Sequence, residues 1–525
     1  MNASSRLSLL IACLLGMPGW LGAQTATLFT VEENGPRSER INIVFLSEGY
    51  TTADMPNFTT HVTTAVNFLF SKEPWKQYRS YCNIYRIEIA SNQSGCDYGN
   101  TSGSTGTRDT YFNAGYFGAG AAPTVEWLLA LGSGGLGKAL TLVNAHVPES
   151  DMPVVLVNDT KYGGAGYSNL SVASIHASSA AIVEHEIGHS FASLTDEYES
   201  AYPGFVPTES YANATAQTTR ELVKWRHWFD ETTPVPTPAS APFNVPPSDG
   251  LVGLFQGAIY QTSGWYRPHF NSLMRSLSRP CGQVNREQFV LQFYQRVSPL
   301  DGFTPVSTSS TVSTPSALSF QVTPKVPTGG APALAVSWKI DGIEQSGAVV
   351  AQFNTLTDFI GNGTHTVTAT VRDPTSFVRL DTSNLLSESV TWNLTLSGQI
   401  PATLAGWRTA YGADTAVSSP DQLANLIKYS LGLDASVPAT VLQMPAGTIT
   451  PATGEQHLTL TIPRRMKRTD VIYTVQVSSD LSDWRSGAGH TVILEDSETR
   501  LVVRDALPIS SGGQRFIRLA VQPVP

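Results

Sequence analysis

Two histidines four residues apart, with a glutamate beside the first, are the residues of this sequence best suited to chemistry. They lie in the segment SSAAIVEHEIGHSFASLTDEY, residues 178–198. In a helix, residues four apart share one face, so His185 and His189 can bind one metal ion. Glu186 is then placed to act as a general base toward water at that ion. A helix with two surface histidines is the alternative, but an apolar stripe opposite the histidines favours a buried, metal-binding helix.

A catalytic metal site also needs a third protein ligand and a position that is left open for water. Asp196 and Glu197 follow His189 by seven and eight residues. If the helix continued, Asp196 would lie about 10 Å farther along its axis, beyond the reach of a short side chain. We therefore expect the chain to turn back soon after His189, so that one of the two carboxylates reaches the metal ion.

Strands that alternate with helices are predicted to position these residues, as in an α/β domain over residues 24–303. Strands are predicted at 40–47, 83–90 and 153–158, and a helix at 54–70. Residues 163–174 form either an edge strand, which can pair with an extended peptide, or a glycine-rich turn.

Two further regions are predicted after this domain. The Thr-, Ser- and Pro-rich segment 304–316 is typical of a linker. Short alternating segments separated by turn residues predict an immunoglobulin-like β-sandwich over residues 317–398. Residues 400–525 are predicted to form a mostly β module with one helix, at 420–433.

The last region is similar to C-terminal modules that are appended to many exported bacterial proteins. The similarity rests on residues 425–434 (NLIKYSLGLD) and 478–484 (SSDLSDW). In related proteins the helix often follows a calcium-binding loop. Here the preceding residues are YGADTAVSSPDQ, which lack the alternating Asp ligands of such a loop, so we expect no calcium.

The N-terminus has the pattern of a signal peptide over residues 1–23, with Arg6 before a short apolar run and small residues at its end. We therefore expect a secreted protein, whether extracellular, periplasmic or associated with the cell surface. No later run approaches ~20 apolar residues, so no transmembrane segment is expected. The 33 Lys and Arg residues against 42 Asp and Glu residues give a net charge of −9, which argues against a nucleic-acid partner.

The cysteines are few, and none lies in a CxxC pair. In an oxidising compartment a bridge between Cys82 and Cys96 is the economical pairing, and it leaves Cys281 unpaired. Spacing alone does not fix the connectivity, so other pairings stay open.

Four segments together resemble the IgA-peptidase family of metzincin-like zinc metallopeptidases, over about residues 30–300. They are FLSEGYT (45–51), YGGAGY (162–167), HEIGHSFASLTDEY (185–198) and YRPHFNSLMRS (266–276). Metzincins have a glycine and a third histidine where this chain has Ala192 and Thr195. In the resembled family DEY follows the helix motif instead.

The resemblance implies one Zn²⁺ ion held by His185, His189 and Asp196, with Met274 in the Met-turn beneath it. Glu197 is then either a hydrogen-bonding partner behind the ligands or the ligand in place of Asp196. A gluzincin arrangement, with Glu221 as the third ligand, is a further alternative. Cleavage of IgA does not follow from the family name.

We therefore interpret the chain as a secreted, monomeric zinc endopeptidase that acts on protein or peptide substrates, with Glu186 as general base. The alternative is an inactive peptidase-like protein that serves binding or adhesion at the cell surface. Tyr260 and Tyr266 precede the Met-turn segment, and each is either a hydrogen-bond donor to an oxyanion or a buried structural residue.

Overall fold

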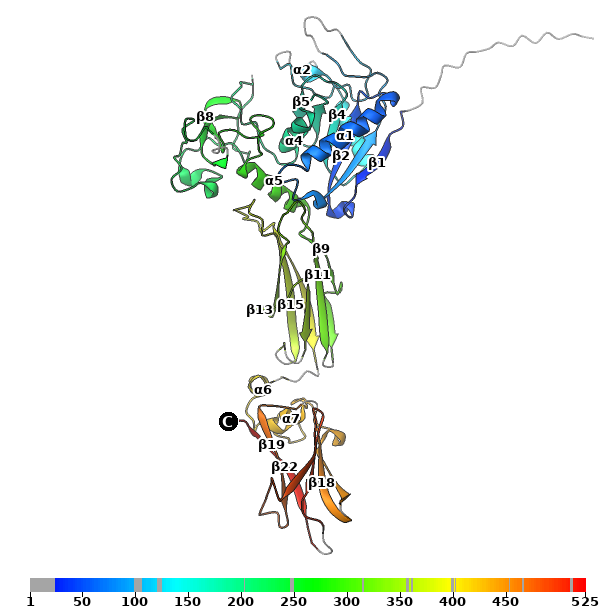
Figure 1. The fold of residues 1–525 in the computed structure, drawn as a ribbon, viewed down its shortest axis with the longest axis vertical. Helices are drawn as coiled ribbons and strands as arrows, with labels where there is room; N and C mark the ends of the chain where they lie inside the picture. Colours follow the sequence, from blue (N-terminus) through cyan, green and yellow to red (C-terminus); the bar gives the residue numbers. More distant parts are fainter. Residues whose placement is uncertain are drawn as a thin grey trace, which may run out of the picture. The chain divides into compact units, whose positions relative to one another are not determined.

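The structure is a computed structural model (Figure 1). Its internal contacts divide the chain into two units. It describes residues 24–98, 106–119, 125–202, 204–245, 250–313, 316–355, 358–359, 362–397, 401, 403–452, 454–464, 467–509 and 513–525. The first unit comprises the chain up to residue 297 together with 326–332 and 375–385, and the second comprises the other residues from 298 onward. The predicted signal peptide lies outside the described residues.

A six-stranded sheet forms the centre of the first unit. Its strands are β1 (Thr27–Glu32), β2 (Ile41–Glu48), β3 (Cys82–Glu88), β4 (Ser150–Val157), β5 (Gly164–Gly166) and β6 (Ser171–Ser174), in the spatial order β1-β3-β2-β4-β6-β5. The four inner strands are parallel, whereas β1 and β5 are antiparallel to their neighbours and form the two edges. The predicted strands are thus confirmed as β2, β3 and β4, and residues 163–174 contain an edge strand.

Helices cover both faces of this sheet, which explains why every residue of β2 is buried. The helices of the first unit are α1 (Met55–Leu69), α2 (Tyr116–Ala119), α3 (Gly135–His146), α4 (Ser179–Ser190) and α5 (Gln283–Arg296). α3 packs on the face that carries Val44 and Leu46. α1, which confirms the predicted helix, contacts α4, and α4 also contacts β4, β5 and β6. A separate hairpin consists of β7 (Phe255–Ala258) and β8 (Gln261–Arg267).

Two sheets form a β-sandwich in the second unit. Their strands are β9 (Leu300–Thr304), β10 (Ser309–Val312), β11 (Ala317–Pro324), β12 (Ala335–Ile340), β13 (Ile343–Gln345), β14 (Val350–Asn354), β15 (Gly363–Arg372) and β16 (Ser387–Leu396), in the orders β10-β16-β15-β12-β13 and β14-β11-β9. Phe320 of the smaller sheet lies 4.9 Å from Trp392 of the larger, between ring centroids.

The linker predicted at 304–316 is wrong, because residues 309–312 form β10 and pair in parallel with β16. Thr304 also ends β9, which pairs with β11. The composition of the segment is that of a linker, but its Thr and Val residues are β-branched and suit a strand at a sheet edge as well.

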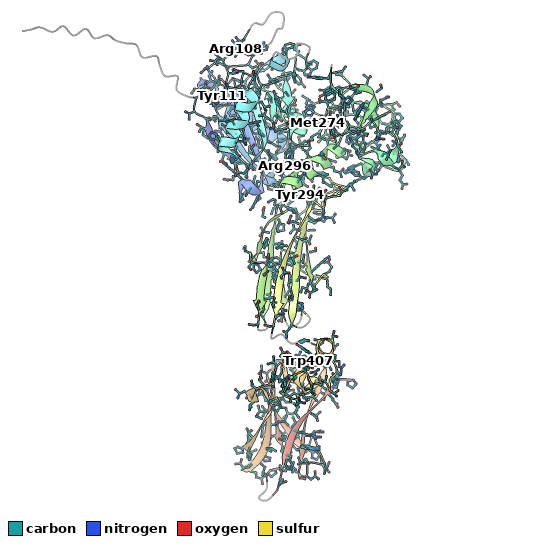
Figure 2. All side chains as sticks on the ribbon, turned by 180° about the vertical axis from the view of Figure 1, so that it is seen from behind. Arg108, Tyr111, Met274, Tyr294, Arg296 and Trp407 are labelled. Carbon is teal, nitrogen blue, oxygen red and sulfur yellow. The ribbon has the colours of Figure 1, made fainter. Side chains whose placement is uncertain are left out.

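The C-terminal region contains a four-stranded and a two-stranded sheet. Their strands are β17 (Ala446–Ala452), β18 (Glu455–Pro463), β19 (Val471–Ser478), β20 (Thr491–Asp496), β21 (Arg500–Asp505) and β22 (Phe516–Pro523), in the orders β17-β18-β21-β20 and β19-β22. Two helices precede them, α6 (Leu404–Tyr411) and α7 (Asn425–Leu431), where one was predicted. α6 has its own start signal, since the Thr403 side chain accepts a hydrogen bond from Gly406 N, and it buries Trp407 (Figure 2).

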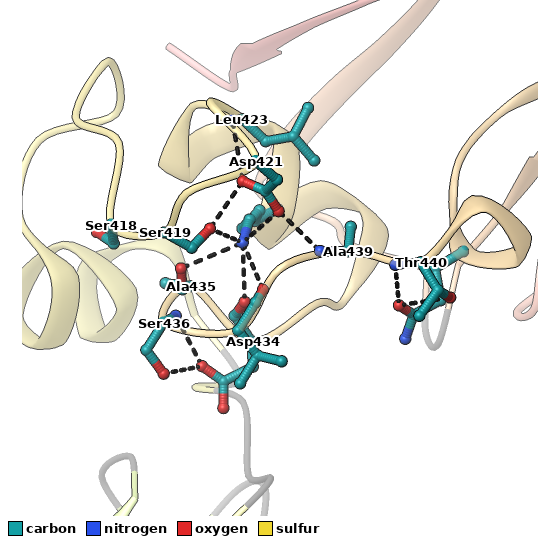
Figure 3. Close-up of polar contacts among 12 residues, drawn as sticks. Ser418, Ser419, Asp421, Leu423, Asp434, Ala435, Ser436, Ala439 and Thr440 are labelled. Carbon is teal, nitrogen blue, oxygen red and sulfur yellow. Dashed lines mark hydrogen bonds and ion pairs between the residues drawn. The ribbon is translucent and has the colours of Figure 1, made fainter.

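Lys428 of α7 is completely buried within a ring of oxygen atoms. Its ammonium lies 2.8 Å from Asp421 Oδ2 and donates hydrogen bonds to the Ser419 hydroxyl and to the carbonyls of Ala435 (3.2 Å) and Val437 (2.6 Å). Figure 3 shows the oxygens of Ser419, Asp421 and Ala435 directed at this central nitrogen. One cation thus ties the segments before and after α7 to the helix.

The predicted Cys82–Cys96 bridge is wrong, because both residues are buried free thiols, as is Cys281. Cys82 begins β3 and pairs with Ile41 at the start of β2, whereas the neighbour of Cys96, Gly95, bonds to Gly49 just past the end of β2. A strand of this length extends about 25 Å, far more than the ~6 Å that separates Cα atoms in a disulfide. No helix in the described part of the chain is long and apolar enough to cross a membrane.

Candidate metal centre

α4 carries both histidines of the HExxH motif and ends directly after the second. Its buried side includes Val183 and Ile187, whereas the His185 and His189 side chains keep 13% and 18% of their surface exposed. The predicted amphipathic helix is thus present, with its histidines on the face that reaches solvent.

The chain reverses immediately beyond α4, as the sequence requires for a carboxylate to reach the histidines. Ser193 adopts a left-handed conformation, with φ of 52°, and Leu194 N donates to Gly188 O over 3.0 Å. Metzincins have a glycine one position earlier, where this chain has Ala192. A serine here makes the turn that a glycine would make without steric cost.

The reversal brings the Asp196 carboxylate to the two imidazoles. Asp196 Oδ1 lies 3.1 Å from His185 Nε2 and 3.5 Å from His189 Nε2, and the two Nε2 atoms are 3.2 Å apart. Ligand atoms at ~2.0–2.1 Å from a tetrahedral ion are about 3.3 Å from one another, so the spacing suits one metal ion. These three residues are the one group in the described part of the chain that brings together enough potential ligands for a metal ion.

The unsatisfied atoms of the group also fit a metal ion. His185 Nδ1 donates to Leu273 O at 3.1 Å and His189 Nδ1 donates to Leu194 O at 2.9 Å. In a neutral imidazole this leaves each Nε2 without a proton and free to bind a metal. Asp196 Oδ1 is buried and has no hydrogen-bond partner among the described residues. A cation between these three atoms would satisfy all of them.

The protonation states of the group follow from its burial and its charges. Burial lowers the pKa of His189, but the Asp196 carboxylate outweighs it and raises this pKa to about 9. The pKa of His185 is likewise raised, against burial, by the adjacent Asp196 carboxylate. Burial would raise the pKa of Asp196, yet the two histidines hold it well below its usual range, so the carboxylate stays ionised.

Glu186 lies between α4 and the edge strand β5. A Cβ atom added to Gly164 would come within 2.8 Å of Glu186 Oε1, and one added to Gly166 within 3.1 Å of Oε2. Glycine at both positions therefore leaves room for the carboxylate. Burial raises the pKa of Glu186, which brings it closer to the range of a general base at neutral pH.

A cleft of about 870 Å³ opens over Glu186 and the three candidate ligands. β5 lines one part of it, and aromatic side chains line much of the rest. Trp127, Tyr162 and Tyr202 are among these, and each keeps at least 40% of its surface exposed. The candidate metal group is therefore accessible to a substrate of considerable size.

The two alternative third ligands are placed elsewhere. The buried Glu197 carboxylate accepts hydrogen bonds from Ser272 Oγ at 2.7 Å, Asn285 Nδ2 at 2.9 Å and Asn213 Nδ2 at 3.1 Å. Its oxygens are thus engaged with other elements, and the residue anchors the segment that follows Asp196. Glu221 is exposed on a short 3₁₀ helix, Arg220–Leu222, outside the metal-binding group.

Met274 is fully buried inside the first unit (Figure 2). A Cβ added to Gly188 would lie 2.7 Å from its sulfur, so Met274 rests against the helix between the two histidines. Its carbonyl also accepts a hydrogen bond from Glu197 N at 2.8 Å. Met274 therefore contacts both α4 and the segment that follows Asp196, and its role as a Met-turn stays a prediction.

Tyr260 and Tyr266, the two candidate oxyanion donors, have different positions in the structure. Tyr260 lines the cleft, but its hydroxyl donates to Asp196 Oδ2. Tyr266 packs at the edge of a separate apolar cluster around Trp225 and Trp228. No spacing rule links Tyr260 to Asp196, because the two residues are 64 positions apart.

Residues 29–244 match the model of the family IgA Peptidase M64, which confirms the predicted resemblance of this region to the IgA-peptidase family. The matched region includes α4 and Asp196 and ends before β7. No curated protein matches the chain. Among solved structures, Chitinase ChiA74 from Bacillus thuringiensis aligns at 8% identity over 53% of this chain and 41% of that chain. The TM-score of this alignment is 0.13, which is too low to indicate a shared fold.

Proposed function

We propose that the first unit is a zinc-dependent endopeptidase. The observation that carries the proposal is the group of His185 Nε2, His189 Nε2 and the orphaned Asp196 Oδ1, spaced for one tetrahedral ion at the floor of an open cleft. Nitrogen and carboxylate ligands with an open fourth position are typical of catalytic zinc. When bound, zinc polarises a carbonyl and acidifies water.

Glu186 would supply the proton transfers. Its carboxylate takes a proton from the attacking water as the C–O bond forms, and delivers it to the amide nitrogen as the C–N bond breaks. The buried position beside His185 keeps this carboxylate close to the candidate metal group, and its raised pKa suits both halves of the transfer.

The edge strand β5 would hold the substrate in an extended form. Gly164 already bonds outward, since its N–H donates to Trp127 O and its C=O accepts from Leu129 N, each over 3.3 Å. Because backbone groups alternate along a strand, the N–H and C=O of Gly166 face the same side of β5, away from β6. A peptide that adds a strand there would lie beside Glu186 and the metal ligands.

The proposal extends to finer features of the fold and location. A metzincin-like arrangement of the first unit is supported by the chain reversal after α4 and by Met274 beneath it. An immunoglobulin-like topology of the sandwich, a monomeric state and secretion remain proposals from the sequence. N-terminal sequencing of exported protein tests the last, and a mature chain that begins at Gln24 is the expected result.

The Glu186→Ala variant tests the mechanism. It should take up one metal ion per chain, as the wild type does, and lose peptide hydrolysis by about 10²–10⁴-fold. Digestion of a peptide library, read by mass spectrometry, measures the loss and also reports cleavage preference. Glu221→Ala is the matched control, because it removes an exposed glutamate and should leave both metal content and hydrolysis unchanged.

Asp196→Ala tests the ligand set, and it should lose the metal ion that Glu221→Ala retains. Wild-type protein that binds metal but hydrolyses no peptide in the library would reject the peptidase assignment and favour a binding protein. Wild-type protein that binds no metal would reject the proposed metal site and, with it, the proposed peptidase.

A further inference from the structure

The turn between β7 and β8 has an unusual backbone. Ile259 and Tyr260 connect the paired residues Ala258 and Gln261, and both have positive φ, of 50° and 64°. A two-residue hairpin turn of this kind favours Asn-Gly, because most side chains oppose positive φ. A β-branched isoleucine there is an outlier that the surrounding structure must maintain.

The tip of this hairpin is bonded to the segment that contains Asp196. Ile259 N donates to Asp196 O at 2.9 Å, and Tyr260 N donates to Tyr198 O at 3.1 Å. The Tyr260 hydroxyl donates to Asp196 Oδ2, and the Tyr198 hydroxyl is also hydrogen-bonded to the Asp196 carboxylate. The strained turn is therefore compensated by contacts to one particular carboxylate and its backbone.

Aromatic packing restricts Tyr260 to this position. Its ring lies 4.7 Å from that of Phe205 and 5.5 Å from that of Tyr198, between centroids, and both pairs meet edge to face. Ile259 is fully buried beside Ala214 and Ala258. The packing thus directs the Tyr260 hydroxyl at Asp196 Oδ2, the carboxylate oxygen that does not face the histidines, and the Tyr198 hydroxyl lies within hydrogen-bond reach as well.

The two oxygens of the Asp196 carboxylate have different surroundings, which matters for metal binding. Oδ2 is engaged by Tyr260, whereas Oδ1 has no hydrogen-bond partner and lies 3.1 Å from His185 Nε2. A carboxylate held in this way presents one oxygen to an ion and leaves the remaining positions open. Partners of this kind orient metal ligands and tune their strength.

We propose that the β7–β8 hairpin tip is a positioning device for the third metal ligand, in which Tyr260 fixes Asp196 as a one-oxygen ligand. The inference rests on the proposed metal site. It concerns residues beyond the region that matches the family, since that region ends at residue 244. Tyr260 is thereby a positioning residue and acts through Asp196 on the metal ion.

Full-length protein, stripped of metal and reloaded with Zn²⁺ or Co²⁺, allows a direct test. Tyr260→Phe removes one hydroxyl, and it should weaken Zn²⁺ affinity by about 10–100-fold in competition with a chromogenic chelator. It should also alter the visible absorption of the Co²⁺ form, because the second carboxylate oxygen becomes free to bind. Tyr202→Phe is the matched control, since Tyr202 lines the same cleft and packs on the Tyr260 ring at 5.6 Å. It should change neither reading.

A second variant separates the hydroxyl from the turn. Tyr260→Gly relieves the backbone at φ of 64° and removes the side chain, so it should lose at least as much metal affinity as Tyr260→Phe. Wild-type affinity and an unchanged Co²⁺ spectrum in both variants would overturn the inference. So would unchanged affinity with a lower kcat, which would make Tyr260 a donor to the substrate. Wild-type protein that takes up no metal would instead show that the proposed metal site itself is wrong.

Discussion

The oxygen ring around Lys428 and the group of His185, His189 and Asp196 both surround a point that suits a cation. In the ring, the cation is a side chain of α7, and it is completely buried. In the candidate metal group, the ligands lie at the floor of a cleft, and Asp196 Oδ1 has no hydrogen-bond partner among the described residues. The first cluster carries its own charge, whereas the second must take one from solution.

The difference separates a structural use of charge from a chemical one. Burial would raise the pKa of Asp421, yet the Lys428 ammonium and backbone N–H groups hold it well below its usual range. The histidines do the same to Asp196. A tethered ammonium leaves no position for water or substrate, so the ring can only hold segments together. The candidate metal group can exchange its cation, and the bound cation can offer a coordination position to a substrate.

Removal of metal is the strongest way to test this comparison. A chelator should abolish peptide hydrolysis, with a loss on the order of 10³-fold or more, because metal chemistry contributes several kcal/mol to such reactions. Hydrogen exchange in peptides from residues 403–525, read by mass spectrometry, should be unchanged by the same treatment. Added Zn²⁺ should restore hydrolysis. Chelator-dependent exchange around α7 would show that the ring also depends on a solution cation.

Lys428→Met should damage the C-terminal region and spare the peptidase. Removing one partner of a buried ion pair costs about 3–5 kcal/mol, because Asp421 and the carbonyls lose their compensation. Urea unfolding, followed by hydrogen exchange in residues 403–525, measures the change. The control is Lys339→Met, since Lys339 and its partner Glu344 are 44% and 66% exposed and the pair contributes at most about 1 kcal/mol. Equal effects of the two variants would contradict a structural role for Lys428.

The two clusters should also differ in their response to pH. In metal-free protein the pKa of His189 is about 9 and that of His185 is raised, so below pH 9 a metal ion must displace a proton to bind. Apparent metal affinity should therefore rise with pH up to about 9, by about tenfold per unit for each displaced proton. Calorimetry in buffers of different ionisation enthalpy counts these protons. Affinity that does not vary between pH 6 and 9 would refute the assigned protonation states.

The stability that the Lys428 ring contributes should stay constant over the same pH range. The pKa of Asp421 is depressed, so its contribution is present above the usual carboxylate pKa and is lost only as pH falls through the depressed value. Comparison of wild type with Lys428→Met at several pH values isolates that contribution.

The sequence predicted the parts of the site that are set by local spacing. The four-residue interval placed His185 and His189 on one face, and the length of an aspartate side chain required a reversal after α4. Nothing in the sequence located that reversal at Ser193, because a non-glycine residue in the left-handed region gives no sequence signal. The parallel strands were equally predictable, since buried central strands are continuous apolar runs.

The remaining features depend on contacts between distant segments. Tyr260 meets Asp196 only because the β7–β8 turn adopts a conformation that its residues disfavour. The disulfide prediction used the separation of Cys82 and Cys96 along the chain, and the length of the intervening strand made that separation misleading. The expected linker failed for a related reason, because pairing with β16 decided the structure of a segment whose composition was ambiguous.

The smallest predicted effect concerns Met274, which packs beneath the candidate metal group. Unlike the Lys428 ring, this group has no side-chain cation to hold its shape. Gly137 of α3 and Gly188 of α4 are both helical glycines, and alanine is favoured over glycine in helices by about 1 kcal/mol. Gly137→Ala meets no atom within 4 Å and should stabilise the protein by about that amount. Gly188→Ala meets the Met274 sulfur at 2.7 Å, and overpacking costs about 1–3 kcal/mol, so the net result should be a loss of up to about 2 kcal/mol.

The same pair of variants should separate further in metal affinity. Displacement of Met274 moves Leu273, whose carbonyl holds His185 Nδ1 at 3.1 Å, so Gly188→Ala should bind Zn²⁺ more weakly while Gly137→Ala binds it like the wild type. Thermal unfolding of the metal-free protein and chelator competition give the two quantities independently. If both variants gained stability equally and kept wild-type affinity, Met274 would be a displaceable side chain rather than a rigid support. The shape of the candidate metal group would then depend on the β7–β8 hairpin alone.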